Sequence, residues 1–105
     1  MGEPEITVQR NDADGRYEIR VGDVLAGFSE FVTDGRGRDV FTHTEVDPAF
    51  EGRGLGKALV AQALADESER GGVVVPRCPF VRRYLERNEV PGLTIEDAKT
   101  VIERT

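Results

Sequence analysis

The sequence has few of the residues that usually hold small proteins together. Its 105 residues include one cysteine and one histidine. A single cysteine excludes a disulfide within the chain, and one cysteine with one histidine is too few for the common zinc sites. We therefore expect no metal, and a fold that rests on one modest hydrophobic core.

Basic residues and long apolar runs are also scarce. The chain has 14 Lys and Arg against 20 Asp and Glu, a net charge of −6. This balance argues against a general nucleic-acid binder, because phosphate contacts need a basic surplus. No run approaches the ~20 apolar residues of a membrane span, and the first ten residues lack the apolar core of a signal peptide. We expect a cytoplasmic protein with one domain over residues 1–105, and with neither nucleic acid nor membrane as partner.

Glycine, in contrast, is plentiful, with 12 residues. The first half of the chain alternates apolar and polar residues, which is typical of half-buried strands. The alternating runs cover residues 6–9, 16–21, 24–32 and 39–46. Their connections are too short for crossovers, so we expect an antiparallel meander. The run 24–32 is apolar on both faces and should be central.

Alternation along the run 39–46 predicts two different faces. One face should carry Val40, Thr42, Thr44 and Val46, and the other Phe41, His43 and Glu45.

The pattern changes period after this run. Apolar residues recur at helical spacing over 54–70, a short apolar run follows at 73–75, and helices are predicted at 79–88 and 94–103. The strand, helix, strand series predicts a crossover between parallel strands. The fold class is therefore mixed α/β (α+β), a mostly antiparallel sheet with one β-α-β crossover and helices packed on it.

The connection over 47–59 has the chemistry of a phosphate site. Alternating glycines permit sharp turns and close approach by a ligand. The free N–H groups and the dipole of a helix start favour an anion, and two basic side chains add positive charge. These residues are Gly52, Gly54, Gly56, Arg53 and Lys57. The segment is not a Walker loop, which needs Ser or Thr where Ala58 stands, and it lacks the Rossmann glycine spacing.

The segment Glu51-Gly52-Arg53-Gly54-Leu55-Gly56 resembles the acyl-CoA pyrophosphate loop of the GNAT superfamily of N-acetyltransferases. The pattern there is Gln or Arg, two residues, Gly, any residue, and Gly or Ala, so Glu51 is a departure. The predicted order of elements is similar to that superfamily too. The resemblance implies acetyl-CoA as co-substrate, with its pantetheine arm beside Val46. The implied cofactor-binding residues are Val46, Glu51, Gly52, Arg53, Gly54, Leu55, Gly56, Lys57 and Ala58.

The lone cysteine stands at the predicted start of a helix. Pro79 suits the first helical position, which makes Cys78 the N-cap. The helix dipole and the neighbouring arginines favour the reactive thiolate form. A free cysteine can equally be a small buried apolar residue, and the local sequence leaves both interpretations open.

Two motifs together resemble a minimal GNAT subfamily of about this length. They are Val-x-Pro-x-Cys-Pro-Phe-Val-x-x-Tyr over residues 74–84 and His-Thr-x-Val over residues 43–46. In that subfamily the cysteine is the candidate catalytic residue and the strand histidine its partner. The resemblance therefore implies catalytic roles for Cys78 and His43.

The implied function is acetyl transfer from acetyl-CoA to an amine on a small molecule or a protein, either directly or through Cys78. The alternative is a non-catalytic CoA-binding or protein-interaction module. The acceptor and the oligomeric state stay open, with a monomer as the working expectation.

Overall fold

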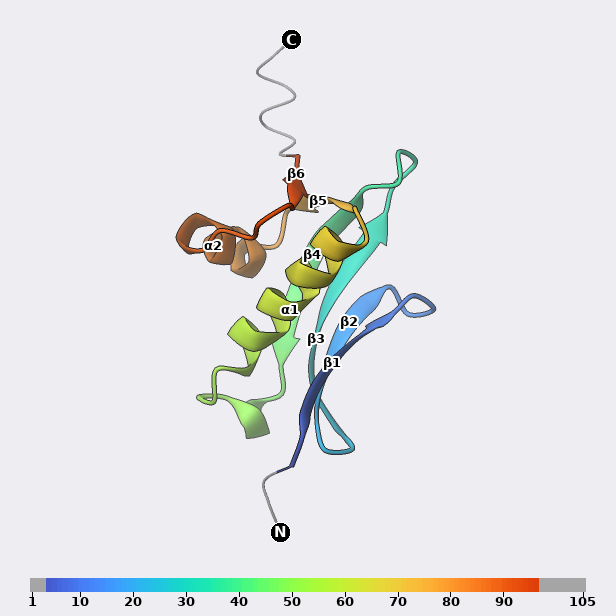
Figure 1. Ribbon diagram of the computed structural model, residues 1–105. Coiled ribbons are helices and arrows are strands. Elements are labelled where there is room, and N and C mark those ends of the chain that lie inside the picture. Colours follow the sequence, from blue (N-terminus) through green and yellow to red (C-terminus); the bar gives the residue numbers. More distant parts are fainter. Residues whose placement is uncertain (1–3, 97–105) are drawn as a thin grey trace.

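The computed structural model describes residues 4–96, which form a curved sheet with two α-helices (Figure 1). The elements in chain order are β1 Ile6–Asn11, β2 Arg16–Val21, β3 Val24–Thr33, β4 Asp39–Val46, the 3-10 turn η1 Pro48–Phe50, α1 Leu55–Glu69, β5 Val73–Pro76, α2 Pro79–Arg87 and β6 Thr94–Ile95. No helix among these residues is long and apolar enough to cross a membrane.

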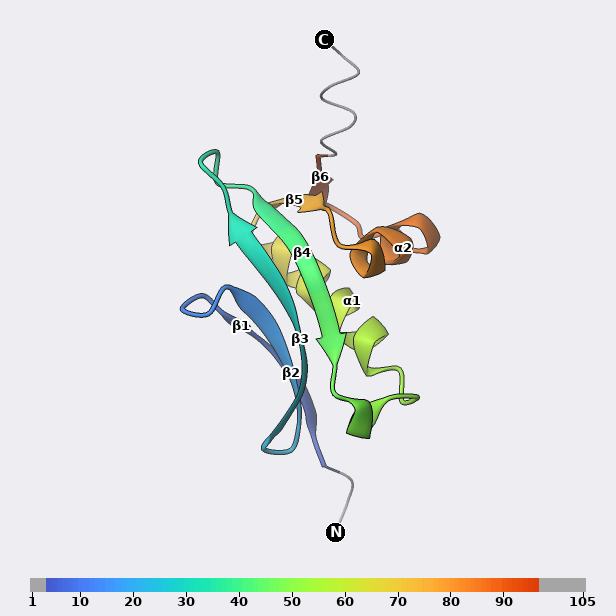
Figure 2. The ribbon, with the colours of Figure 1, turned by 180° about the vertical axis from the view of Figure 1, so that it is seen from behind.

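The strands lie in the sheet in chain order, from β1 to β6. The strands β1 to β4 are antiparallel neighbours, whereas β5 and β6 join in parallel. The predicted meander, the inner position of β3 and the parallel crossover are confirmed. The helix α1 crosses one face of the sheet, and Figure 2 shows that neither described helix covers the opposite face of β2 to β4.

The core lies between α1 and the sheet. The buried side of α1 consists of Leu55, Leu59, Val60, Ala63 and Leu64. Three rings from the sheet face it, with centroids 5.6 Å apart for Tyr17 and Phe31 and 5.8 Å apart for Phe31 and Phe41. Each fully buried leucine contributes about 2 kcal/mol. This packing fixes the helix axis and holds its N-terminus beside the end of β4.

A bulge in β4 changes the predicted faces of that strand. Phe31 pairs with Phe41 and Glu30 pairs with His43, so Thr42 has no counterpart on β3. An extra residue reverses the alternation beyond it. As a result Phe41 and Thr44 both lie on the α1 side. The prediction that Phe41 shares a face with His43 was wrong, because a bulge depends on pairing with another strand.

The strands β4 and β5 part soon after they meet. Their pairing runs from Asp39 and Val74 to Phe41 and Pro76. The N–H groups of Arg77 and Cys78 then both donate to the carbonyl of Phe41, at 3.0 and 2.8 Å. Beyond that point, the described residues give β4 no strand partner on this side, and a gap opens between β4 and α2.

The segment after α2 differs from the prediction. Thr94 and Ile95 were expected to begin a helix, but they form β6 alongside Val73 and Val74 of β5. The free edge of β5 offers backbone groups that an extended segment satisfies, and Thr and Ile suit a strand. The rest of the helix predicted over 94–103 lies outside the described residues.

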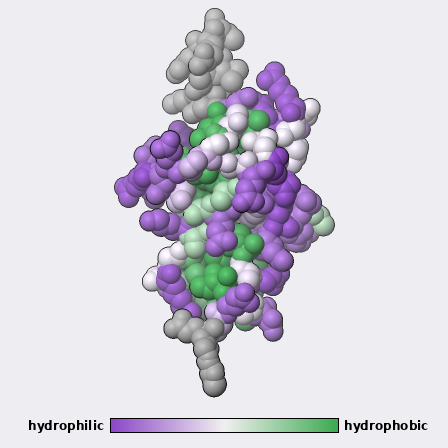
Figure 3. All heavy atoms as spheres, in the orientation of Figure 1, coloured by the Kyte–Doolittle hydropathy of each residue, from purple (hydrophilic) through white to green (hydrophobic). Residues whose placement is uncertain are grey.

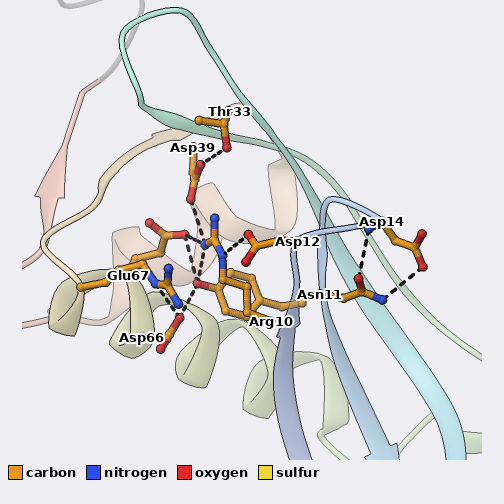
Figure 4. A network of polar contacts seen from close by, with 10 residues as sticks. Arg10, Asn11, Asp12, Asp14, Thr33, Asp39, Asp66 and Glu67 are labelled. Atoms are coloured by element: carbon orange, nitrogen blue, oxygen red, sulfur yellow. Dashed lines mark hydrogen bonds and ion pairs between the residues drawn. The ribbon is translucent and has the colours of Figure 1, made fainter.

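A buried polar network ties the C-terminal end of α1 to the sheet (Figure 4). The Nη1 atom of Arg10 donates to Tyr17 Oη at 2.9 Å, to Asp39 Oδ2 at 3.0 Å and to Glu67 Oε2 at 2.9 Å. The hydroxyl of Tyr17 in turn donates to Asp66 at 2.7 Å. One guanidinium thus joins β1, β2, β4 and α1.

Protonation of Glu67 balances the charge in this network. Burial, together with the nearby Asp39, raises the pKa of Glu67 to about 7. Burial opposes the charge on Asp39, but hydrogen bonds with Glu67, Thr33 and Arg10 hold its pKa below the usual value. At weakly acidic pH, Glu67 is therefore neutral while Asp39 is ionised.

Candidate active site

The chain between β4 and α1 forms a loop with two turns that favour glycine. Asp47 Oδ1 accepts from the N–H of Ala49 at 2.8 Å, which caps the turn η1. The backbone then passes through Gly52 and Gly54, at φ values of 84° and 74°. L side chains rarely adopt these angles, so the predicted conformational role of both glycines is confirmed.

Gly56 also makes room for a side chain of α2. It lies in the first turn of α1, and a Cβ atom there would stand 2.8 Å from Cζ of Phe80 and 3.5 Å from Cγ2 of Val46. The missing side chain therefore lets a ring from α2 lie against α1. Both Gly56 and Phe80 line the groove described next, and the predicted contact between Gly56 and a ligand stays a prediction.

A groove follows the glycine loop at the open end of the gap beside β4. Its volume is about 410 Å³. We call it the loop groove, and its lining is Thr44, Val46, Phe50, Glu51, Gly52, Gly54, Leu55, Gly56, Lys57 and Phe80. Seven of the nine predicted cofactor-binding residues are among them, so the structure brings most of that set together.

The other two predicted residues lie beside the loop groove. The guanidinium carbon of Arg53 lies 5.3 Å from the centroid of the Phe50 ring. The N–H of Ala58 donates to Gly54 at 3.1 Å, so it takes part in the helix. The N–H groups of Leu55, Gly56 and Lys57 belong to the first helical turn, which has no acceptor within the helix. An anion at this loop would bind to these three.

Cys78 lies at the closed end of the gap. It is the N-cap of α2, with Pro79 in the first helical position, and only 2% of it is exposed. Its Sγ atom lies 3.4 Å from Oγ1 of Thr44, which in turn lies 2.8 Å from Oγ of the buried Ser29. The thiol is therefore both buried and next to a residue of the loop groove.

His43 points to the other face of β4. Its Nε2 atom lies 3.0 Å from Oε1 of Glu45, and its ring lies 6.2 Å from that of Phe28. Both His43 and Glu45 are exposed. Because adjacent strand residues point in opposite directions, His43 faces away from the side where Thr44 meets Cys78. The structure does not bring His43 and Cys78 into contact.

Comparison with known protein families supports the same interpretation of the fold. The family model described as GCN5-related N-acetyl-transferase matches residues 16–91, from the start of β2 to the end of α2 and beyond. The chain belongs to this family. A search of curated proteins gave no match. The matched span includes the glycine loop, the loop groove and Cys78.

Sequence reasoning missed three lining residues of the loop groove, namely Thr44, Phe50 and Phe80. Thr44 stands next to His43 in the His-Thr-x-Val motif. Its place in that motif could have identified it as a candidate site residue. The two phenylalanines were recognisable only as aromatic residues next to the glycine loop and the helix cap. Their place in the groove depends on how α1 and α2 pack, which local sequence does not encode.

Three chemical features lie in or beside the groove. The N-terminus of α1 offers N–H groups, with Lys57 beside them. The free edge of β4 offers backbone groups to an extended ligand. Thr44 lines the groove with a hydroxyl, and the buried thiol of Cys78 lies 3.4 Å from that hydroxyl. A long ligand with an anionic group, amides and a reactive end is complementary to these features.

Proposed function

We propose that this protein moves the acetyl group of acetyl-CoA to an amine acceptor. The observation that carries the proposal is the loop groove, which is lined by the N-terminus of α1 and by Val46 and Thr44 of β4. The Sγ atom of Cys78 lies 3.4 Å from Oγ1 of Thr44. Acetyl-CoA has a pyrophosphate, two amides and a thioester in that order. Each finds a matching group in or beside this groove.

The pyrophosphate would bind at the glycine loop. The N–H groups of Leu55, Gly56 and Lys57 point out of the helix start, and the dipole adds partial positive charge. The side chain of Lys57 adds a full charge beside them. Glu51, which lines the same groove, would turn its carboxylate away from the phosphates, because like charges repel.

The pantetheine arm would run along β4 in the manner of an added strand. The edge of β4 after Phe41 has backbone donors and acceptors without a strand partner among residues 4–96. Val46 would provide an apolar contact. This arrangement leads the thioester to the part of the gap bordered by Thr44 and Cys78.

The acceptor would arrive from the sheet face opposite α1. His43 lies on that face, paired with Glu30 across β3 and β4 and hydrogen-bonded to Glu45. A protonated amine is attracted to these carboxylates, and neutral imidazole can take its proton. His43 is therefore the proposed general base, for a cationic acceptor that is a small molecule or a protein.

Two routes can deliver the acetyl group. In the direct route the amine attacks the thioester carbonyl, the C–S bond breaks, and CoA leaves as a thiol after taking up a proton. In the covalent route the thiolate of Cys78 attacks first and CoA leaves, and then the amine attacks acetyl-Cys78 and regenerates the thiolate. The burial of Cys78 favours the direct route.

The test is release of CoA thiol from acetyl-CoA, with and without a panel of amines. We expect release that depends on the amine. Binding of acetyl-CoA without such release would contradict the enzymatic proposal and identify a CoA-binding module instead. Mass spectrometry of an extract treated with labelled acetyl-CoA would then identify the acceptor.

A further inference from the structure

Three hydroxyl and thiol groups meet where β4 and β5 part. They belong to Ser29 of β3, Thr44 of β4 and Cys78 at the start of α2. The Oγ1 atom of Thr44 is at the centre, with Oγ of Ser29 at 2.8 Å and Sγ of Cys78 at 3.4 Å. Of the three residues, Thr44 is the one that lines the loop groove. The groove is thereby connected to two polar groups of the interior.

The two outer members of this group are buried. Ser29 has no exposed surface, and 2% of Cys78 is exposed. Ser29 belongs to the sheet face that α1 covers, which is the side that Figure 3 shows in space-filling form. Within residues 4–96, each of the two has one side-chain hydrogen bond, and in both cases the partner is Thr44. Water cannot take the place of Thr44 at these buried positions.

This burial determines where the protons lie. A hydroxyl has one proton to donate and can accept two hydrogen bonds. If Thr44 donated to Ser29, the proton of Ser29 would be buried without an acceptor, which is unfavourable. All buried protons are satisfied when Ser29 and Cys78 both donate to Oγ1 of Thr44. The proton of Thr44 is then left beside the loop groove, with no acceptor in the described part of the chain.

Other hydroxyl groups of the protein use their protons internally. Tyr17 and Thr33 donate to carboxylates at 2.7 and 2.6 Å, and Ser68 donates to a backbone carbonyl at 2.7 Å. The hydroxyl of Thr44 differs because its acceptor sites are filled and its proton is not used. It is therefore a donor available to a ligand in the groove.

We propose that Thr44 donates this hydrogen bond to the carbonyl oxygen of the acetyl thioester and stabilises the negative charge that forms there during transfer. The inference rests on the proposed function, which brings the thioester to Thr44. Ser29 is a positioning residue, since it holds Oγ1 of Thr44 together with Cys78. A donor that is already oriented needs no reorganisation when the charge forms.

The charge on the oxygen forms and disappears within one transfer. The amine nitrogen bonds to the carbonyl carbon, its proton passes to His43, and an electron pair of the C=O bond moves to the oxygen that faces Thr44. The pair returns as the C–S bond breaks. The CoA thiolate takes up a proton from solvent, to which His43 returns its own.

The positions of Thr44 and His43 suit these two tasks. They are consecutive residues of β4, and their side chains point to opposite sides of the sheet. A nucleophile approaches a carbonyl carbon at an obtuse angle to the C=O bond. The base and the hydrogen-bond donor therefore have to lie on different sides of the thioester, as these two residues do.

Infrared spectroscopy tests the hydrogen bond without an acceptor amine. Acetyl-CoA with a heavy-isotope label in the carbonyl carbon is bound to the intact chain. A hydrogen bond to the oxygen weakens the C=O bond, so the band should lie at lower frequency in the unaltered protein than in Thr44→Val or Thr44→Ala. Thr44→Ser should restore the lower frequency. Ser29→Ala should show part of the shift, because one of the two groups that orient Thr44 is lost.

The second measurement is the rate of amine-dependent CoA release. Thr44→Val should lower kcat about a hundredfold, the usual effect of removing one such donor, and leave the affinity for acetyl-CoA nearly unchanged. Thr44→Ser should recover most of the rate. Thr42→Val is the matched control, since Thr42 is an exposed threonine of the same strand that does not line the groove. It should change neither quantity.

The possible failures are distinguishable. The same carbonyl frequency in the unaltered protein and in Thr44→Val would overturn this inference alone. An equal loss of kcat in Thr42→Val would overturn it too, and so would a loss of acetyl-CoA affinity in Thr44→Val with kcat unchanged, because Thr44 would then act in binding only. Failure of the unaltered protein to bind acetyl-CoA would overturn the proposed function as well.

Discussion

The Sγ atom of Cys78 lies 3.4 Å from the Oγ1 atom of Thr44, across the point where β4 and β5 part. The contact exists because a bulge at Thr42 turns Thr44 toward the α1 side of the sheet. It joins Cys78 of the Cys-Pro-Phe motif to Thr44 of the His-Thr-x-Val motif. It also leaves His43 on the opposite face, which separates the thiol from the imidazole.

Replacement of Cys78 tests the route of acetyl transfer. Cys78→Ala should retain most of the transfer activity, because the direct route needs no nucleophile from the protein. Loss of the buried sulfur should lower the free energy of unfolding by about 1 kcal/mol. Steady-state rates and urea unfolding measure the two effects. Complete loss of transfer with intact acetyl-CoA binding, or acetyl-Cys78 detected by mass spectrometry, would establish the covalent route instead.

Replacement of Gly54 tests the anion site at the glycine loop. Gly54→Ala should cost about 1 kcal/mol of stability, because alanine is strained at a φ of 74°. It should also weaken acetyl-CoA binding by moving the N–H groups that follow it. Gly37→Ala is the control. Gly37 has a similar φ of 79° and open space around it, and it belongs to a different loop, between β3 and β4. Equal effects of both substitutions on acetyl-CoA affinity would contradict the site.

Replacement of His43 separates acceptor chemistry from cofactor binding. His43→Gln should lower kcat/KM for the amine about a hundredfold, the usual contribution of a general base, and leave the affinity for acetyl-CoA unchanged. Thr42→Ala, at an exposed neighbouring position, should change neither quantity. A large loss of acetyl-CoA affinity in His43→Gln would show that the histidine acts on the cofactor side.

Glu67 should make the stability of the protein depend on pH. Its pKa in the folded state is about 7, above the ordinary 4.5. The folded protein therefore holds a proton that the unfolded chain releases, and stability falls as pH rises from about 4.5 to 7. The loss is about 3 kcal/mol. Asp39, whose pKa is lowered, is ionised in both states over this range and adds no slope.

Glu67→Gln should remove most of this slope, because glutamine stays neutral. Urea unfolding below and above the window gives the measurement, and the variant should be the more stable protein above it. Glu69→Gln changes an exposed residue of the same helix and should keep the slope. A steep slope that persists in Glu67→Gln would contradict the role of the buried network.

Local patterns were sufficient to predict the meander, the crossover and the two helices. The predicted helix over 54–70 differs from α1 by one residue at each end, and Cys78 does cap α2. Alternation and capping are local properties, which explains this agreement. The glycine loop was also predictable, because a positive φ selects glycine directly.

Features that depend on partners distant in sequence were not predictable. The bulge in β4 arises from its register with β3, and β6 forms because the edge of β5 is free. The contact between Gly56 and Phe80 depends on how two helices meet. The network around Arg10 joins residues up to 57 positions apart. In each case the local sequence is also compatible with a different local structure or contact.

Isothermal titration with acetyl-CoA tests the central claim most directly. We expect saturable binding of one molecule per chain, weakened by Gly54→Ala and not by Gly37→Ala. The absence of binding at millimolar acetyl-CoA would contradict the account, because the loop groove would then not be a site for this ligand.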